Sequence, residues 1–348
     1  MFQPLSARSD TGRHIAFPQH VTATLRGAVY ALALPACFGW TASMARIGGD
    51  RISTRSLEPH CRALRAFGLD IRHQDNSIDI LGGRARAAKF SIDDKGITAT
   101  SMAILIAASL DGQSVIQSAS LEIECDDVLQ AVASLGASAH RDGRTLVIRG
   151  PLAPLERVLR VPPDHLVWGT YAIAAAMSGG STRSTIAPSP RFTPVTNMLQ
   201  SAGLTVTTLD GGLCTSGYPA HSFNIRTGMY PDFPSDLLPQ AAALAAVCPG
   251  TSKLTESHYG ARFDHLPGMS RLGVALTVEN DTIVIRGPAD LLGTCVQGAG
   301  IRETAALALI ALAAKGESTI VKAESLARGY EDFAGTLRSM GADVRMEG

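Results

Sequence analysis

The sequence predicts an α/β protein built from five copies of one repeated unit, and three observations support this. A helix-ending glycine recurs at spacings of 68, 67, 70 and 68 residues, in the series Gly68, Gly136, Gly203, Gly273 and Gly341. Fourteen residues after each of the first four stands another glycine, and the interval holds two short strands and a turn such as Asp142-Gly143. Each copy begins with an Ala- and Leu-rich helix closed by glycine, upstream of the residues just described. One unit is therefore predicted as helix, strand, helix, strand, strand.

The first helix of each unit is apolar on nearly every side, for example over 172–177, 241–247 and 305–314. A helix of this kind is buried all round, so we expect helices inside and sheets outside. The apolar run 28–44 is interrupted by Pro35 and Gly39 and is too short to span a bilayer. We predict that it is a buried helix.

The segment Val161-Pro162-Pro163-Asp164 has the composition of a linker and falls between the second and third units. It predicts two domains, residues 1–163 with two units and residues 164–348 with three. A chain of 348 residues suits two domains that each bury a core. Two domains imply a cleft that could hold a substrate.

Composition narrows the function classes. Lys plus Arg and Asp plus Glu both total 31, so no net charge favours nucleic acid or an anionic membrane surface. The six cysteines form no CxxC pair and the nine histidines show no ligand spacing, which favours reduced thiols, a cytoplasmic setting and no metal. The first twenty residues have no apolar h-region, so we expect no secretory signal there.

The stretch 230–236 points to catalysis. Two prolines fix the approach to an alanine-rich helix, and Asp236 falls in its first turn. Free amides and the helix macrodipole stabilise a carboxylate there, so it should stay ionised and point out of the helix end. This is the position of a general base; the alternative is an ordinary charge at a helix start.

Three arginines precede predicted helices, where the positive helix end disfavours a cation: Arg26, Arg302 and Arg328. Helix N-termini with guanidinium groups form a phosphate or carboxylate receptor, although each arginine could equally be solvated. The polar loop 48–55 could act as a lid or be a surface turn. In 93–96, Lys95 could contact a phosphate or belong to a charge cluster at a helix start.

At this point five stretches carry a resemblance, in order and with near-constant offsets. From about Arg26 to Gly348 the chain resembles the enolpyruvyl transferase family, in its UDP-N-acetylglucosamine 1-carboxyvinyltransferase branch rather than that of 5-enolpyruvylshikimate-3-phosphate synthase. The stretches are Gly-Gly-Asp-Arg-Ile-Ser-Thr-Arg (48–55), Pro-Asp-Phe-Pro-Ser-Asp (231–236), Leu-Thr-Glu-Ser-His-Tyr-Gly-Ala-Arg-Phe-Asp-His (254–265), Ile-Arg-Glu-Thr-Ala (301–305) and Ala-Arg-Gly-Tyr-Glu-Asp-Phe (327–333). The resemblance implies a two-domain inside-out α/β barrel fold with substrates in the cleft.

The resemblance also implies catalytic roles. Asp236 matches the base that takes the proton of the acceptor hydroxyl. Asp50 stands at a loop position usually held by cysteine, which donates a proton and is alkylated by fosfomycin; a carboxylic acid can also deliver a proton. The implied substrate contacts are Arg55, Arg302 and Arg328 for phosphoenolpyruvate, Lys95, Arg55 and His60 for a nucleotide, and Arg26, Asp164 and Arg262 elsewhere in the cleft.

The chain departs from the family pattern in several places. The family has six units, and the one missing here is the first, which carries a Lys-Asn pair that grips the substrates. Family residues near the arginines are replaced by Ser56, Gly260, Ala261 and Gly300. Without a third unit, helices 28–37 and 102–110 should lie open along one side, and this predicts a homodimer that covers them.

The resulting prediction is an enzyme. It would join the enolpyruvyl group of phosphoenolpyruvate to a hydroxyl of a nucleotide-like acceptor, in a specialised pathway and without a cofactor. One alternative is a diverged enzyme that uses the same pocket for elimination or cyclisation of a phosphorylated or carboxylated substrate. A second is a non-catalytic protein that binds a nucleotide-like anion.

Overall fold

The computed structural model describes residues 13–49, 56–93, 96–153, 158–260 and 262–347. The chain divides into two compact units, Met1–Val161 and Pro162–Gly348. The predicted boundary after residue 163 lies close to this division. Each unit has its own hydrophobic core, and each is described by itself below.

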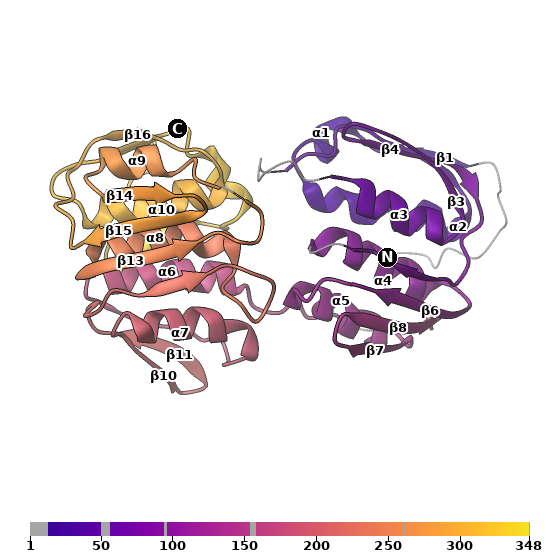
Figure 1. Ribbon diagram of the computed structural model, residues 1–348, viewed down its shortest axis with the longest axis horizontal. Coiled ribbons are helices and arrows are strands. Elements are labelled where there is room, and N and C mark those ends of the chain that lie inside the picture. Colours follow the sequence, from indigo (N-terminus) through magenta and orange to yellow (C-terminus); the bar gives the residue numbers. More distant parts are fainter. Residues whose placement is uncertain (1–12, 50–55, 94–95, 154–157, 261, 348) are drawn as a thin grey trace. The chain divides into compact units, whose positions relative to one another are not determined.

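The first unit holds two copies of the repeat. The first copy comprises η1 (Arg26–Leu32), α2 (Ala33–Phe38), β2 (Thr41–Met44), α3 (Glu58–Ala66), β3 (Leu69–Gln74) and β4 (Ser77–Gly83), preceded by β1 (His14–Ala16) and α1 (Gln19–Thr22). The second comprises β5 (Lys89–Ser91), α4 (Ile97–Ser109), β6 (Gly112–Gln117), α5 (Ile123–Ser134), β7 (Ser138–Asp142) and β8 (Thr145–Gly150). Their sheets have the strand orders β1-β2-β4-β3 and β5-β6-β8-β7. In Figure 1 the helices of this unit lie between these two sheets.

The second unit holds three copies. They comprise α6 (His165–Met177), β9 (Ser181–Arg183), η2 (Pro190–Phe192), α7 (Thr193–Ser201), β10 (Thr205–Leu209) and β11 (Gly212–Ser216); then β12 (Asn224–Arg226), η3 (Ser235–Leu237), α8 (Leu238–Val247), β13 (Gly250–Thr255), α9 (Leu266–Arg271), β14 (Ala275–Glu279) and β15 (Thr282–Gly287); then β16 (Cys295–Gln297), α10 (Ile301–Ala313), β17 (Thr319–Val321), η4 (Glu324–Arg328) and α11 (Phe333–Ser339). Their sheets have the orders β10-β11-β9, β12-β13-β15-β14 and β16-β17.

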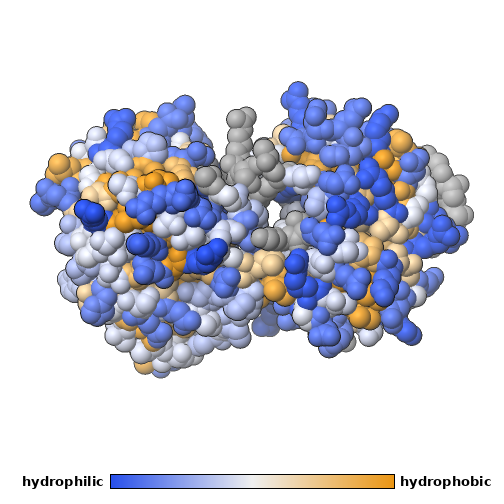
Figure 2. All heavy atoms as spheres, in the orientation of Figure 1, coloured by the Kyte–Doolittle hydropathy of each residue, from blue (hydrophilic) through white to orange (hydrophobic). Residues whose placement is uncertain are grey.

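The predicted arrangement of helices inside and sheets outside is confirmed. Helices α6, α8 and α10 contact one another in the middle of the second unit, and most of their residues are buried. The sheets turn their other faces to solvent, so residues of β14 alternate between exposed and half-buried at its start. Hydrophobic residues gather over β14 and β15 in the face drawn in Figure 2, amid hydrophilic neighbours.

Several local predictions are wrong. The run 28–44 is not one helix, because Gly39 ends α2 in the left-handed conformation (φ 67°) and the chain continues as strand β2. The sequence also gave no sign of β5, β12 and β16, three-residue strands that pair in parallel with the next strand of their sheet. Three residues are too few to show an alternating pattern.

The expected open face of the first unit is only partly present. Helix α4 is covered by η1, α2, α3 and α5, and its apolar residues between 102 and 108 are fully buried except Leu105. On α2, by contrast, Leu34 is 42% exposed and Phe38 38% exposed. The neighbouring helices of two copies therefore cover α4 without a third. None of the helices in the described ranges is both long and apolar enough to span a membrane.

Candidate functional site

The starts of the three buried helices of the second unit carry the predicted polar residues. Asp164 precedes α6, Asp236 lies in the turn η3 directly before α8, and Arg302 is the second residue of α10. Their charges interact. The carboxylates of Asp236 and Asp164 help to raise the pKa of Arg302, and the charges of Asp164, Arg302 and Asp236 all act on the pKa of His165. The repeat thus places equivalent helix N-termini, with their positive dipole ends, around one site.

Asp236 is held by an arginine that the sequence predicted as a substrate contact. Arg262 Nη1 donates to Asp236 Oδ1 over 2.6 Å, and Nη2 lies 3.4 Å from Glu303 Oε1. The Arg262 side chain is only 4% exposed, whereas that of Asp236 is 36% exposed. Burial opposes the charge of Arg262, but Asp236 foremost and then Glu303 raise its pKa above the ordinary value. Asp236 therefore remains half open to a ligand while its position is fixed.

A buried carboxylate ties the segments around this pair together. Glu256 Oε2 accepts from the hydroxyl of Ser235 at 2.6 Å, and Oε1 accepts from the hydroxyl of Thr227 at 2.8 Å. Oε1 also accepts from the backbone amides of His258 at 2.8 Å and Tyr259 at 3.0 Å. Glu256 thus links the residue before Asp236 to the loop that leads to Arg262.

Arg302 has different surroundings. Its guanidinium carbon lies 5.3 Å from the ring centroid of Tyr330, and its buried Nη1 has no hydrogen-bond partner among the described residues. Burial opposes the charge, yet Tyr330 and Asp236 raise the pKa of Arg302. The Tyr330 hydroxyl is fixed in turn by Thr170 at 2.9 Å and Gln240 at 3.4 Å. A buried guanidinium with an unused donor is suited to bind an anion.

Arg328 does not start a helix, so that prediction is wrong. It is the last residue of η4, and α11 begins only at Phe333, where Asp332 caps it by accepting from the amide of Gly335 at 2.8 Å. The next residue, Gly329, packs so tightly that a Cβ would lie 2.4 Å from Ile301 Cγ2. This close approach brings the backbone after Arg328 against the start of α10.

Asp164 has a structural task. Its Oδ1 accepts from the amides of Leu166 at 2.7 Å and Val167 at 3.2 Å and so caps α6. Asp164 itself is exposed, and the next residue, His165, is buried. Burial lowers the pKa of His165, which keeps the imidazole neutral at the same helix start.

Two predicted residues lie in the first unit. Arg26 Nη2 donates to the carbonyl of Ser56 at 3.2 Å, and a Cβ on Gly49 would lie 2.9 Å from Arg26 Cβ. Arg26 therefore contacts the described residues on either side of positions 50–55. His60 is 1% exposed and bonded to Thr98 Oγ1 at 2.9 Å, and burial, aided by Arg26, lowers its pKa to about 3. As placed, it faces the interior, and its role as a nucleotide contact stays a prediction.

The other predicted residues lie outside the described ranges: Asp50, Arg55 and Lys95. Within the second unit the structure brings together Asp164, Asp236, Arg262 and Arg302. Sequence reasoning missed Glu256, Glu303 and Tyr330, although all three stand inside the quoted motifs. For Glu256 and Glu303 the available signal was an acidic residue in the same motif as Arg262 and Arg302, at positions that become buried, whereas Tyr330 gave no such signal.

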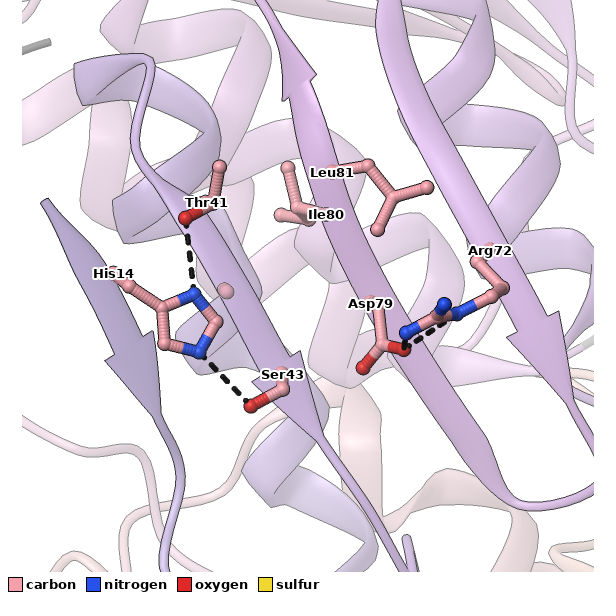
Figure 3. A pocket seen from close by; sticks show the side chains of 8 residues that line it. His14, Thr41, Ser43, Arg72, Asp79, Ile80 and Leu81 are labelled. Atoms are coloured by element: carbon pink, nitrogen blue, oxygen red, sulfur yellow. Dashed lines mark hydrogen bonds and ion pairs between the residues drawn. The ribbon is translucent and has the colours of Figure 1, made fainter. Parts of the chain in front are cut away.

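An open recess of about 260 Å³ lies elsewhere, on the outer face of the sheet β1-β2-β4-β3 (Figure 3). His14 bridges Thr41 Oγ1 at 2.9 Å and Ser43 Oγ at 3.2 Å, and Arg72 pairs with Asp79 at 2.7 Å. None of the predicted site residues lines it, and these polar groups already have partners. We assign it no function.

The chain is similar to known proteins along nearly its whole length. A family model described as EPSP synthase (3-phosphoshikimate 1-carboxyvinyltransferase) matches residues 6–337. The chain is 33% identical over 331 residues to UDP-N-acetylglucosamine 1-carboxyvinyltransferase 3 of Symbiobacterium thermophilum, covering 94% of this chain and 78% of the relative. It is 30% identical over 335 residues to UDP-N-acetylglucosamine 1-carboxyvinyltransferase of Myxococcus xanthus, covering 95% and 79%.

Solved structures show the same fold. The enolpyruvyl transferase NikO from Streptomyces tendae superposes with a TM-score of 0.80 at 23% identity, over 95% of this chain and 79% of that one. EPSP synthase from Acinetobacter baumannii gives 0.68 at 16% identity, over 90% and 76%. The predicted inside-out α/β fold of enolpyruvyl transferase type is confirmed.

Proposed function

Because the chain belongs to the EPSP synthase (3-phosphoshikimate 1-carboxyvinyltransferase) family, we propose that it transfers the enolpyruvyl group of phosphoenolpyruvate to a hydroxyl of a nucleotide-like acceptor. Two relatives at 33% and 30% identity are named for carboxyvinyl transfer to UDP-N-acetylglucosamine, which supports both the donor and the class of acceptor. The reaction would serve a specialised pathway and would need no cofactor.

The observation that carries the proposal is the half-exposed carboxylate of Asp236 beside buried guanidinium groups. In the proposed reaction Asp236 takes the proton of the acceptor hydroxyl as its oxygen attacks the substituted carbon of phosphoenolpyruvate. Asp50 delivers a proton to the methylene carbon, and loss of inorganic phosphate together with a proton of the resulting methyl group then restores the double bond. A positioned base of this kind contributes roughly 10² or more in rate.

The arginines would stabilise charge on phosphoenolpyruvate. Arg302 has a buried donor to offer, and its guanidinium lies within cation–π distance of the Tyr330 ring. Arg55 and Arg328 would complete the anion site, and Arg26 and Lys95 would contact the acceptor. Charge stabilisation by groups that are already in place is a large part of catalysis, since nothing must reorganise during the reaction.

The test is incubation of the protein with phosphoenolpyruvate and a panel of nucleotides and nucleotide sugars, followed by released phosphate and by product mass. Transfer predicts one phosphate per acceptor and a product heavier by the enolpyruvyl group. Asp236→Asn should lose roughly 10²-fold or more in rate and still bind phosphoenolpyruvate. The exposed residue Asp281 offers a matched control, and Asp281→Asn should retain activity.

The same experiment separates the alternatives. Phosphate release without an enlarged acceptor would indicate a diverged elimination or cyclisation. Tight binding of both ligands without any product, equally in the protein and in Asp236→Asn, would indicate a non-catalytic binding protein. Either outcome would overturn the proposed transfer.

A homodimer also stays a proposal. The sequence predicts a dimer because two apolar helices, 28–37 and 102–110, are expected to be open on one side. The second of these, α4, is buried within its own unit, so only the exposure of Leu34 and Phe38 on α2 supports the dimer. Sedimentation of the protein and of a Leu34→Glu, Phe38→Glu double variant is the test. A monomer at micromolar concentration before substitution would refute the dimer.

A further inference from the structure

The packing of α3 against β3 in the first unit brings together three side chains of metal-binding type, Glu58, Cys61 and His73. Glu58 and Cys61 are three residues apart on α3, which places them on one face of the helix. β3 alternates, and His73 lies on the same side as the buried Leu69. One ligand atom from each of the three lies within 4.8 Å of the other two.

The hydrogen bond of His73 shows which ring nitrogen is available. Nε2 lies 3.0 Å from the backbone carbonyl of Asp75, and because a carbonyl oxygen only accepts, Nε2 must carry the hydrogen. In neutral imidazole Nδ1 is then an acceptor. It lies 3.9 Å from Glu58 Oε2, which is an acceptor as well. Metal-bound histidines commonly donate their other nitrogen to a backbone carbonyl in this way.

We propose that Glu58 Oε2, Cys61 Sγ and His73 Nδ1 bind a zinc-type divalent cation, with a fourth position open to solvent. Sulfur with nitrogen and one carboxylate is a ligand set for Zn²⁺, and three protein ligands leave one position for water. The thiolate and the carboxylate would balance the charge of the ion. Arg65 Nη1 contacts the other oxygen, Glu58 Oε1, at 3.1 Å and can stay there.

The geometry needs little adjustment. Zn–S bonds of about 2.3 Å and Zn–N and Zn–O bonds of about 2.1 Å place tetrahedral ligand atoms roughly 3.3–3.6 Å apart. The present separations, up to 4.8 Å, would therefore close by at most about 1.2–1.5 Å. Cys61 is fully buried and fixed by the core, whereas the Glu58 side chain is 45% exposed and can adjust. The exposed side of Glu58 and His73 also gives the ion a way in.

Cobalt titration of the chelator-treated full chain tests the proposal. One equivalent of Co²⁺ should give a near-ultraviolet thiolate-to-cobalt band that Zn²⁺ removes, and Zn²⁺ should raise the Tm, since it binds the folded state. Cys61→Ser should abolish the band. Glu58→Gln and His73→Gln should weaken binding by on the order of 10-fold or more.

Controls separate this site from chance binding at other thiols and imidazoles. Cys295→Ser and His140→Gln, both at exposed positions, should leave the band unchanged. If Cys61→Ser fails to fold, the two partly exposed ligands still decide the outcome. The proposal is wrong if no band appears, if the band follows Cys295, or if His73→Gln and Glu58→Gln bind Co²⁺ as tightly as the unsubstituted protein. These results would leave His73 and Glu58 as neighbouring side chains that bind no metal.

Discussion

Replacing Glu256 should separate the structural support of the site from its chemistry. Glu256→Ala removes the acceptor for four donors at once: the hydroxyls of Thr227 and Ser235 and the amides of His258 and Tyr259. The hydroxyls can rotate toward other acceptors, but the two amides cannot. At about 1–3 kcal/mol for each donor left unsatisfied, the loss should be about 3 kcal/mol or more.

Glu256→Gln is the matched control. Its amide oxygen can keep the three bonds made by Oε1, and the Ser235 hydroxyl can turn to accept from the new NH₂ group. The cost should then be about 1 kcal/mol, leaving a difference of about 2 kcal/mol between the two variants. The same comparison applied to activity should show Glu256→Gln retaining much more transfer than Glu256→Ala, because only the alanine frees Ser235 and the loop to Arg262.

Thermal unfolding followed by fluorescence gives the measurement. The two tryptophans are Trp40 in the first unit and the buried Trp168 in the second, so a Trp40→Phe background reports on the second unit alone. A loss of 3 kcal/mol should lower the Tm by roughly 6–12 °C for a unit of this size. Equal melting of Glu256→Ala and Glu256→Gln, or an alanine variant within 1 °C of the parent, would refute the reasoning.

Three further predictions concern the site and the core. Arg302→Lys should weaken phosphoenolpyruvate binding by on the order of 10-fold, because lysine loses the stacking on Tyr330; calorimetry would show it. Fosfomycin should add no mass to the protein, since Asp50 has a carboxylate where the drug needs a thiolate; mass spectrometry decides. Acid should destabilise the fold. Burial lowers the pKa of His60 and His265 to about 3, and unfolded histidine titrates near 6.5. Between about pH 3 and 6.5 the unfolded chain therefore binds more protons than the folded chain. As the pH is lowered through this range, the free energy of unfolding should decrease by up to about 1.4 kcal/mol per pH unit for each histidine. Denaturant unfolding at pH 7 and 5.5 should show this, with a smaller change in His265→Gln.

Much of the fold was predictable because the repeat is a periodic signal. Glycines in left-handed conformations, such as Gly68 and Gly136, end one helix in each copy, and only glycine adopts φ values of 97° and 99° without strain. The all-round apolar helices could be read as buried for the same reason. The short parallel strands could not, because their pairing is set by the next strand of the sheet and not by their own three residues.

The site was predictable only in part. Helix starts are local features, so Asp236 and Arg302 could be placed from the sequence. The partners of Arg262 could not, since Asp236 lies 26 residues earlier in the same copy of the repeat and Glu303 lies 41 residues later in the next copy. The start of α11 also lies beyond Arg328, because Asp332 caps the helix with its side chain and the helix begins at the next residue, Phe333. Glu58, Cys61 and His73 gave no ligand pattern for a related reason, since one of them lies on the next strand.

The two buried arginines of the site, similar in the sequence, have different tasks. Arg262 contacts the carboxylates of Asp236 and Glu303 through its two terminal nitrogens, while its buried Nε has no partner among the described residues. Arg302 has a buried Nη1 without a partner among the described residues, and its guanidinium carbon lies 5.3 Å from the ring centroid of Tyr330. A buried charge that lacks a paired carboxylate is costly, and an incoming anion removes that cost. We therefore propose that Arg302 receives the charge of the substrate, whereas Arg262 positions the base.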